Sequence, residues 1–279
     1  MSSSDEAGRK HWNSVAQSWN LYSSPLRPCG EDQVAFLHLA NAYSTTTPGA
    51  PIAVLILGVT PEIATMAWPA GTVVTGVDKA PEMIKCAWPG DVSGTRHAHC
   101  CDWFALPRPG NPYDIAIGDG SFNTLSYPGE MRRLLVKLRT LARPGALLIL
   151  RSFVRSSAAE SFSDLLAAAQ SGQARNFHAF KIRLAMALQA SPEEGIQLNE
   201  AWQSWCRLEQ AIEGLVDKNG WLPDVVRTIK LFRGKQVRLS FPTIDELIGV
   251  WEAEGVHLLD RYMPKYEMGQ RCPILVGRL

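Results

Sequence analysis

The stretch AVLILGVTPEIATMAWPAGTVVTGVD, residues 53–78, decides the fold of this chain. An apolar run at 53–57 ends at Gly58, a helix start follows, and a second apolar run at 72–77 ends at Asp78. Continuous Val, Ile and Leu strands of this kind are buried on both faces, which predicts a parallel sheet covered by helices. Such sheets bind ligands at the carboxyl ends of their strands, where an acid suits a ribose diol. The stretch therefore predicts a site for a nucleotide-type cofactor.

The turn after the first strand narrows the class of cofactor. A dinucleotide fold needs G-x-G-x-x-G around its pyrophosphate, but here Gly58 stands alone and Thr60 replaces the second glycine. Pro61 lacks an N–H that a phosphate would use, and Glu62 adds negative charge there. No G-K-[ST] follows, so a P-loop is absent. A cofactor with a ribose and no phosphate fits better, S-adenosylmethionine being the common one, although Thr and Pro are also ordinary helix-start residues.

Two further strands of the predicted sheet also end in polar residues. The run 97–101 leads into Asp102 and Trp103, and the run 113–117 leads into GDGSFN, residues 118–123. An acid beside an aromatic residue suits an adenine, because the carboxylate accepts from the exocyclic amine and the ring stacks on the base. An ordinary strand-end cap is the other reading of Asp102. Together with the first two strands, these ends place polar groups along one edge of the sheet.

With these motifs the chain resembles the class I S-adenosylmethionine-dependent methyltransferases. The matching segments are LILGVTPE, TGVDKAPEMI, CDWFALP, YDIAIGDGSFNTL and LARPGALLILRSF, and the departure is the single glycine of the first one. The resemblance implies an α/β, Rossmann-like, doubly wound seven-stranded sheet with a reversed last strand. It also implies S-adenosyl-L-methionine as cofactor and S-adenosyl-L-homocysteine as product. The cofactor-binding residues predicted on this basis are Trp19, Arg27, Gly58, Thr60, Pro61, Asp78, Lys79, Met83, Cys101, Asp102, Trp103, Gly118, Asp119 and Gly120.

The organisation of the chain follows from where the strand–helix alternation stops. We predict an N-terminal helical lid at 1–48, a cofactor-binding α/β core at 49–155, a helical insertion at 156–240 and a C-terminal unit at 241–279. The last unit contains a helix that begins at Thr243, with Glu246 completing a capping box, and two strands at 256–263 and 273–279. The loop between these two strands covers only residues 264–272, and two strands joined by so short a loop are antiparallel neighbours.

The N-terminal segment is predicted to form a helix at 9–23 with one aromatic face, which carries Trp12 and Trp19. Such a face is explained by packing of the helix against the rest of the protein. The resemblance implies the alternative that the helix lies over the cofactor as a lid. Arg27 follows a proline-broken turn and is a candidate for binding a carboxylate of cofactor or acceptor, or else a surface arginine. Arg151, on the predicted buried strand 146–153, points into the cleft or forms a structural ion pair.

The insertion carries helical patterns at 158–171, 175–190 and 198–218. An insertion at this edge of the sheet is placed as a substrate cap, and a dimerisation arm of a homodimer is the alternative. A pocket with an apolar, aromatic lining suits flat or apolar small molecules. The predicted lining residues are Trp12, Trp19, Phe177, Phe180 and Trp202, and the predicted polar contacts are Arg27, Arg151 and Tyr266.

Methyl transfer from a sulfonium needs orientation and a deprotonated acceptor, so a single base suffices. Asp119, expected to be exposed by its flanking glycines, is the candidate for that base, with a turn residue or a ligand of the cofactor's amine as alternatives. No metal-ligand cluster is recognisable. The tetrapeptide [DN]-P-P-[YF] of nucleic-acid amino-methyltransferases is absent, since DGSF stands at that strand end, which favours a small-molecule acceptor.

Composition indicates a globular cytoplasmic protein. There are 28 lysines and arginines against 27 acids, so nothing points to a nucleic-acid or anionic-membrane partner. The chain starts with a polar segment and has no apolar run of membrane length, and its six cysteines contain no C-x-x-C pair. Three functions remain: a small-molecule methyltransferase, another nucleotide-cofactor enzyme such as an aminopropyl transferase or an oxidoreductase, and a methyltransferase-like binding or regulatory protein.

Overall fold

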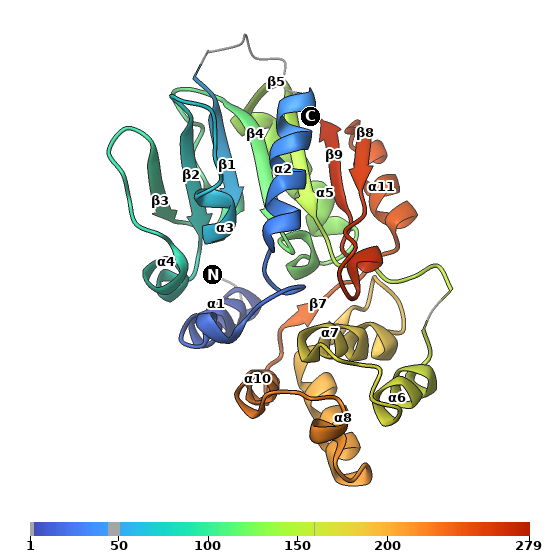
Figure 1. Cartoon of the computed structure of the whole chain (residues 1–279). Helices are drawn as coiled ribbons and strands as arrows, with labels where there is room; N and C mark the ends of the chain where they lie inside the picture. Colours follow the sequence, from blue (N-terminus) through green and yellow to red (C-terminus); the bar gives the residue numbers. More distant parts are fainter. Residues whose placement is uncertain (1–2, 44–50, 159) are drawn as a thin grey trace.

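A seven-stranded sheet forms the centre of the molecule in a computed structural model that describes residues 3–43, 51–158 and 160–279 (Figure 1). Its strand order is β3-β2-β1-β4-β5-β9-β8. The first five strands are parallel, whereas β9 is antiparallel to both of its neighbours, which confirms the predicted fold class. The strands are β1 (Ala53–Leu57), β2 (Val73–Asp78), β3 (Arg96–Cys100), β4 (Tyr113–Asp119), β5 (Ala142–Arg151), β8 (His257–Tyr262) and β9 (Ile274–Arg278).

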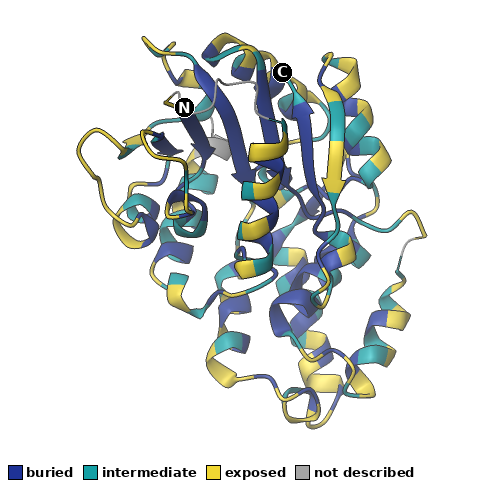
Figure 2. Cartoon of the chain, turned by 45° about the horizontal axis from the view of Figure 1, so that its top comes forward, coloured by how far each residue is buried: buried dark blue, intermediate teal, exposed yellow. Residues whose placement is uncertain are grey.

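Successive residues of the central strands supply two separate hydrophobic cores. In β1, Val54 and Ile56 pack beneath α2 (Gly30–Tyr43), α3 (Pro61–Ala64) and α4 (Pro81–Ala87) on one face. Leu55 and Leu57 pack on the other face, beneath α5 (Gly129–Leu141) and α11 (Ile244–Ala253). The strands therefore form a buried layer between two layers of helix, which Figure 2 shows in dark blue. This is the reason that the strands read as continuous apolar runs.

The helices on the second face follow sequence signals closely. The buried residues of α5 recur at the spacing of one helix face, and they are Met131, Leu134, Leu135, Leu138 and Leu141. At the start of α11, Thr243 Oγ1 accepts a hydrogen bond from the Glu246 N–H at 3.2 Å. The Thr243 N–H in turn donates to Glu246 Oε2 at 2.7 Å, so the predicted capping box is confirmed.

A group of short helices follows β5 and has a hydrophobic core of its own. It comprises α6 (Phe162–Gln170), α7 (Phe177–Leu188), α8 (Leu198–Ala211), α9 (Leu215–Lys218), α10 (Pro223–Arg227), the 3-10 helix η4 (Thr228–Phe232) and the strand pair β6 (Ile196–Gln197) and β7 (Arg238–Leu239). The rings of Phe177, Phe180, Trp205 and Trp221 contact one another at its centre. The division of the chain into four units stays a prediction, and its boundary at 48/49 lies outside the described residues.

Two predicted helix ranges are wrong. The helix predicted over 198–218 is divided, because α8 ends at Ala211 and Gly214 adopts a left-handed conformation with φ of +67°. The helix predicted over 9–23 is instead α1 (Ser3–Ala16) followed by the 3-10 helix η1 (Trp19–Leu21). After the glycine turn, α3 covers only four residues.

Asn123 connects the two segments by which the chain passes between the sheet and the helical region. The Asn123 amide nitrogen donates to the carbonyl oxygens of Phe153 at 2.7 Å and Ser240 at 2.8 Å. Its amide oxygen accepts from the Phe153 N–H at 2.9 Å, and its backbone carbonyl accepts from the Ser240 N–H at 2.9 Å. The chain thus leaves the sheet and returns to it at one point.

The helical region and α1 gather at the end of the sheet toward which the arrowheads of β1 and β2 point (Figure 1). This is the carboxyl end of the parallel strands, where ligands of such sheets bind. In the part of the chain that the structure describes, no helix combines the length and the apolar composition needed to cross a membrane.

Candidate functional site

The Gly58 turn lies at the carboxyl end of β1 and borders open space. Gly58 has φ of +111°, and apart from Gly58 and its chain neighbours no heavy atom of the described residues lies within 4 Å of the position that a Cβ would take. Its N–H donates to the Val77 carbonyl oxygen at 2.9 Å and its carbonyl accepts from the Val77 N–H at 3.1 Å. The turn is therefore fixed beside the end of β2. Thr60 and Pro61, the N-cap and first residue of α3, take the helix-start positions predicted for them.

Asp78 ends β2 directly beside this turn. Its Oδ1 accepts a hydrogen bond from the Ala80 N–H at 2.8 Å, while Oδ2 has no hydrogen-bond partner among the described residues. Burial raises the pKa of Asp78 to about 6, against the opposing effects of the Ala80 N–H and the Lys79 charge. Because one oxygen is left to accept hydrogen bonds, the position suits the ribose diol that the sequence predicts.

Asp102 and Trp103 lie next to the end of β2, as their place after β3 predicts. Asp102 Oδ1 accepts from the Phe104 N–H at 2.8 Å, and Oδ2 lies 3.5 Å from the Lys79 ammonium. Asp102 is thus a strand-end cap that also forms an ion pair. The Trp103 indole N–H donates to the Val77 carbonyl oxygen at 2.8 Å. Cys101 donates from Sγ to the Asp102 carbonyl, and burial raises the pKa of its thiol.

Arg27 binds the turn itself. Its guanidinium forms two hydrogen bonds to Glu62 Oε1, of which the one from Nε is 2.8 Å long. It also donates to the Trp19 carbonyl oxygen at 3.2 Å and lies 4.9 Å from the centre of the Trp19 ring. Arg27 is therefore not a surface arginine. The second oxygen of Glu62 is buried and has no hydrogen-bond partner among the described residues, which leaves an unsatisfied acceptor at the turn.

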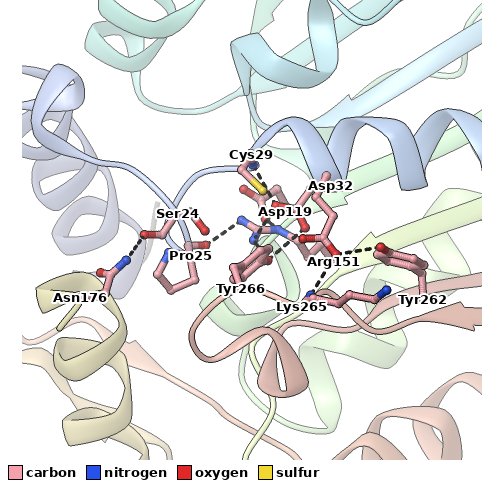
Figure 3. A network of polar contacts seen from close by, with 11 residues as sticks. Ser24, Pro25, Cys29, Asp32, Asp119, Arg151, Asn176, Tyr262, Lys265 and Tyr266 are labelled. Carbon is pink, nitrogen blue, oxygen red and sulfur yellow. Dashed lines mark hydrogen bonds and ion pairs between the residues drawn. The ribbon is translucent and has the colours of Figure 1, made fainter. Parts of the chain in front are cut away.

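A network around Arg151 occupies the carboxyl ends of β4 and β5 (Figure 3). Arg151 Nε donates to Asp119 Oδ1 at 2.6 Å, Nη1 to the Tyr266 hydroxyl at 2.7 Å, and Nη2 to the Pro25 carbonyl at 2.8 Å. The Tyr266 hydroxyl donates to Asp32 Oδ1 at 3.0 Å, and Asp32 Oδ2 lies 3.4 Å from Arg151 Nη1. The side chains of Arg151 and Asp32 are fully buried. Arg151 therefore forms a buried ion pair, which is the second of the two roles that the sequence suggests for it.

Two carboxylates share one guanidinium in this network, so it carries a net negative charge when all three groups are ionised. Burial raises the pKa of Asp119, Arg151 opposes that effect, and the charges of Asp32 and Glu62 add to it. The prediction that Asp119 is exposed is wrong, because the side chain turns back onto Arg151 and remains only 7% accessible. Its Oδ2 accepts no hydrogen bond from the described residues.

Several predicted site residues have packing roles. Phe180 is fully buried within the aromatic centre of the helical region and Phe177 nearly so, against the prediction that they line an acceptor pocket. Met83 lies in the core beneath α4. A Cβ at Gly118 would meet Ser121 Oγ at 2.4 Å, and one at Gly120, where φ is +61°, would meet the Phe153 ring at 2.9 Å. Trp12, Trp19 and Trp202 are partly buried.

No family model and no curated protein sequence matches the chain. Solved structures do. The Burkholderia thailandensis 1,6-didemethyltoxoflavin-N1-methyltransferase, with bound 1,6-didemethyltoxoflavin and S-adenosylhomocysteine, matches with a TM-score of 0.55 at 14% identity, over 100% of this chain and 91% of that one. The CcbJ methyltransferase of Streptomyces caelestis matches at 0.54 and 13% identity, over 95% of both chains. The chain has the class I methyltransferase fold.

A protein from Rhodobacter sphaeroides that carries the provisional description of a zinc-dependent alcohol dehydrogenase is also similar in structure. It matches with a TM-score of 0.53 at 15% identity, over 98% of this chain and 96% of that one. At such identities the likeness concerns the fold alone, and function has to be argued from the site.

Some residues of the site escaped the sequence analysis. Asp32 lies 119 positions from Arg151 along the chain, and no local pattern links the two. From the sequence, Glu62 indicates only that a phosphate would be disfavoured at the turn. Lys181 could have been noticed in the sequence, because it is a lysine within the mainly apolar segment HAFKIRLAM of a helix that is largely buried.

Proposed function

We propose that this protein transfers a methyl group from S-adenosylmethionine to a small-molecule acceptor. The observation that carries the proposal is the pairing, on this fold, of the open Gly58 turn with a carboxylate oxygen of Asp78 that has no hydrogen-bond partner among the described residues. Both lie at the carboxyl ends of adjacent parallel strands. That arrangement offers a ribose a charged acceptor and a backbone that it can approach closely.

The remaining residues of the turn fit the amino-acid portion of this cofactor. The unpartnered Glu62 Oε2 is a buried acceptor suited to an ammonium group, and the Arg27 guanidinium beside it is suited to a carboxylate. Asp102 and the Trp103 indole lie at the end of β2, where an adenine would accompany a ribose held by Asp78. A pyrophosphate fits poorly, because Glu62 and Pro61 occupy the helix start. When bound, the cofactor supplies an activated methyl group.

Asp119 is the proposed base or orienting group for the acceptor. Its Oδ1 is held by Arg151 at 2.6 Å, so the carboxyl group is fixed in position while Oδ2 can accept a proton or a hydrogen bond. Burial raises the pKa of Asp119, which makes it a stronger base than an exposed aspartate. Asp32 and Tyr266 hold Arg151 from its other side and act as positioning residues.

Calorimetric titration of the purified protein with S-adenosylmethionine, S-adenosylhomocysteine and NAD tests the proposal. We expect both sulfur-containing ligands to bind and NAD not to bind. Binding of NAD alone would favour an oxidoreductase on this fold. Binding of none of the three would refute the cofactor assignment and favour a regulatory or binding protein.

A further inference from the structure

Lys181 is a buried cation that lacks a counter-ion. It lies on α7 with none of its surface exposed, and its ammonium donates one hydrogen bond, to Thr228 Oγ1 at 2.9 Å. No carboxylate of the described residues lies within ion-pair distance of it. The ammonium instead faces two aromatic rings, at 4.7 Å from the centre of Tyr22 and 5.2 Å from that of Phe232. A buried charge without a partner is costly, so its presence requires an explanation beyond stability.

Two unsatisfied polar groups accompany this cation. The Tyr22 hydroxyl is buried, on a residue that is 8% exposed, and no described residue forms a hydrogen bond with it. His178, which is 1% exposed, donates from Nε2 to the Leu21 carbonyl oxygen at 2.9 Å, because a carbonyl can only accept. Its Nδ1 therefore carries a lone pair, and no donor of the described residues reaches it. The rings of Tyr22 and His178 stack, with their centres 5.3 Å apart.

A third group approaches from α1. His11 is 4% exposed, its Nδ1 has no hydrogen-bond partner in the described part of the chain, and its ring lies 6.2 Å from that of Phe232. Burial, and then the charges of Lys235 and Lys181, lower the pKa of His11 to about 3. Burial, and then the Lys181 charge, lower the pKa of His178 to about 4. Both imidazoles are therefore neutral at pH 7, whereas Lys181, whose pKa burial lowers to about 7, carries a positive charge below that pH.

We use the name Lys181 cluster for Lys181, Tyr22, His178, His11 and Phe232. They come from α1, from the segment after η1, from α7 and from η4, which are the N-terminal and helical parts of the chain. The walls are ring faces, and the polar groups are one cationic donor, one hydroxyl and imidazole nitrogens without partners. Such a set complements a flat molecule with an anionic group and a hydrogen-bond donor next to it.

The Lys181 cluster lies close to the proposed transfer site. The Tyr22 carbonyl oxygen accepts from Arg27, which binds Glu62 of the glycine turn. Two residues further on, the Ser24 carbonyl accepts from Asn176, the N-cap of α7, at 2.8 Å, and the next carbonyl, of Pro25, accepts from the Arg151 network (Figure 3). One short segment, residues 22–25, thus lies between the cluster and Asp119.

We propose that the Lys181 cluster binds the methyl acceptor and that this acceptor is a flat aromatic acid with a hydroxyl group beside its carboxylate. The ammonium would be the counter-ion of the carboxylate, the rings of Tyr22 and Phe232 would cover its faces, and His178 Nδ1 would accept from the hydroxyl. Because α1 packs against η4, the proposal includes a movement of α1 that admits the ligand. The assignment as acceptor site rests on the proposed function, whereas binding of the acid does not.

Salicylate and salicylamide are a matched pair of probes, because they share shape and hydroxyl group and differ in the negative charge. We expect the wild-type protein at pH 6, where Lys181 is protonated, to bind salicylate with a millimolar dissociation constant, as is usual for about ten non-hydrogen atoms. Salicylamide should bind at least tenfold more weakly. Lys181→Met should weaken salicylate binding at least tenfold, while Lys230→Met, which removes an exposed lysine of η4, should leave it unchanged.

Absence of salicylate binding by the wild-type protein, or equal affinity for the two probes, would overturn the proposal without any variant. Retained affinity in Lys181→Met would also overturn it. A parallel titration with S-adenosylhomocysteine distinguishes failure of the acid site from failure of the proposed methyltransferase function. Salicylate binding without cofactor binding leaves the acid site in place and refutes the methyltransferase, and the reverse result refutes only the acid site.

Discussion

Replacement of Asp78 by asparagine should weaken binding of S-adenosylhomocysteine while stabilising the free protein. The substitution keeps an oxygen for the Ala80 N–H, which Oδ1 of Asp78 now accepts at 2.8 Å, but removes the charge. A hydrogen bond to a charged group contributes about 1.5–3 kcal/mol, so the loss corresponds to roughly a tenfold to 150-fold weaker affinity.

Stability should change in the opposite direction. The folded-state pKa of Asp78, about 6, lies above the value of about 4 for an unfolded chain, so the folded state holds its proton more tightly. Stability is therefore lost as pH rises from about 4 to about 6, by roughly 3 kcal/mol for two pH units. Asparagine has no such charge, and Asp78→Asn should raise the thermal midpoint at pH 8.

Calorimetry between pH 5 and pH 8 and thermal unfolding without ligand are the two measurements. The wild-type affinity should fall below a pH of about 6, since a protonated carboxyl loses its charged acceptor, whereas the affinity of Asp78→Asn should not change with pH. Glu82→Gln, a charge removal on α4 beside the exposed Lys85, is the matched control and should leave both readouts unchanged. Wild-type affinity in Asp78→Asn would refute the ribose assignment.

Four further changes test other parts of the site. Asp102→Asn should reduce discrimination between the adenosine and inosine forms of the cofactor, measured as a ratio of dissociation constants, and an unchanged ratio would make Asp102 a cap only. Arg151→Met leaves two buried carboxylates without their cation and should lower the free energy of unfolding by about 3–5 kcal/mol, measured with denaturant. Deletion of residues 1–22 should abolish turnover yet keep the sheet, checked by circular dichroism, and loss of the folded state would contradict this. The pKa of Lys181, about 7, lies below its unfolded value, so wild-type stability should rise between pH 7 and pH 10 relative to Lys181→Met.

The parts of the fold that a local pattern determines could be predicted from the sequence. Buried strands on both faces give apolar runs, a tight turn needs Gly58 with its positive φ, and a capping box marks the start of α11. The reversed strand β9 follows from the short connection after β8. Each of these features is fixed by residues within a few positions of one another.

The site was predictable only as a set of strand ends. Arg151, Asp119, Asp32 and Tyr266 come from four separate segments, and the sequence shows none of the hydrogen bonds among them. The aromatic residues of the helical region gave a misleading signal. Phe180 has the composition of a pocket lining, but a group of short helices needs a hydrophobic core of its own, and burial of the ring there takes precedence.

Asn123 joins the outgoing and the returning chain, so both covalent connections between the helical region and the sheet lie at one place. Gln189 repeats the arrangement, with its side chain hydrogen-bonded to both the N–H and the carbonyl of Phe241. A segment whose ends meet in this way can change in length and composition without altering the register of β4, β5 or β9. The helical region, which we propose takes part in selecting the acceptor, can therefore diverge, or be exchanged in the laboratory between residues 153 and 240, while the sheet remains the same.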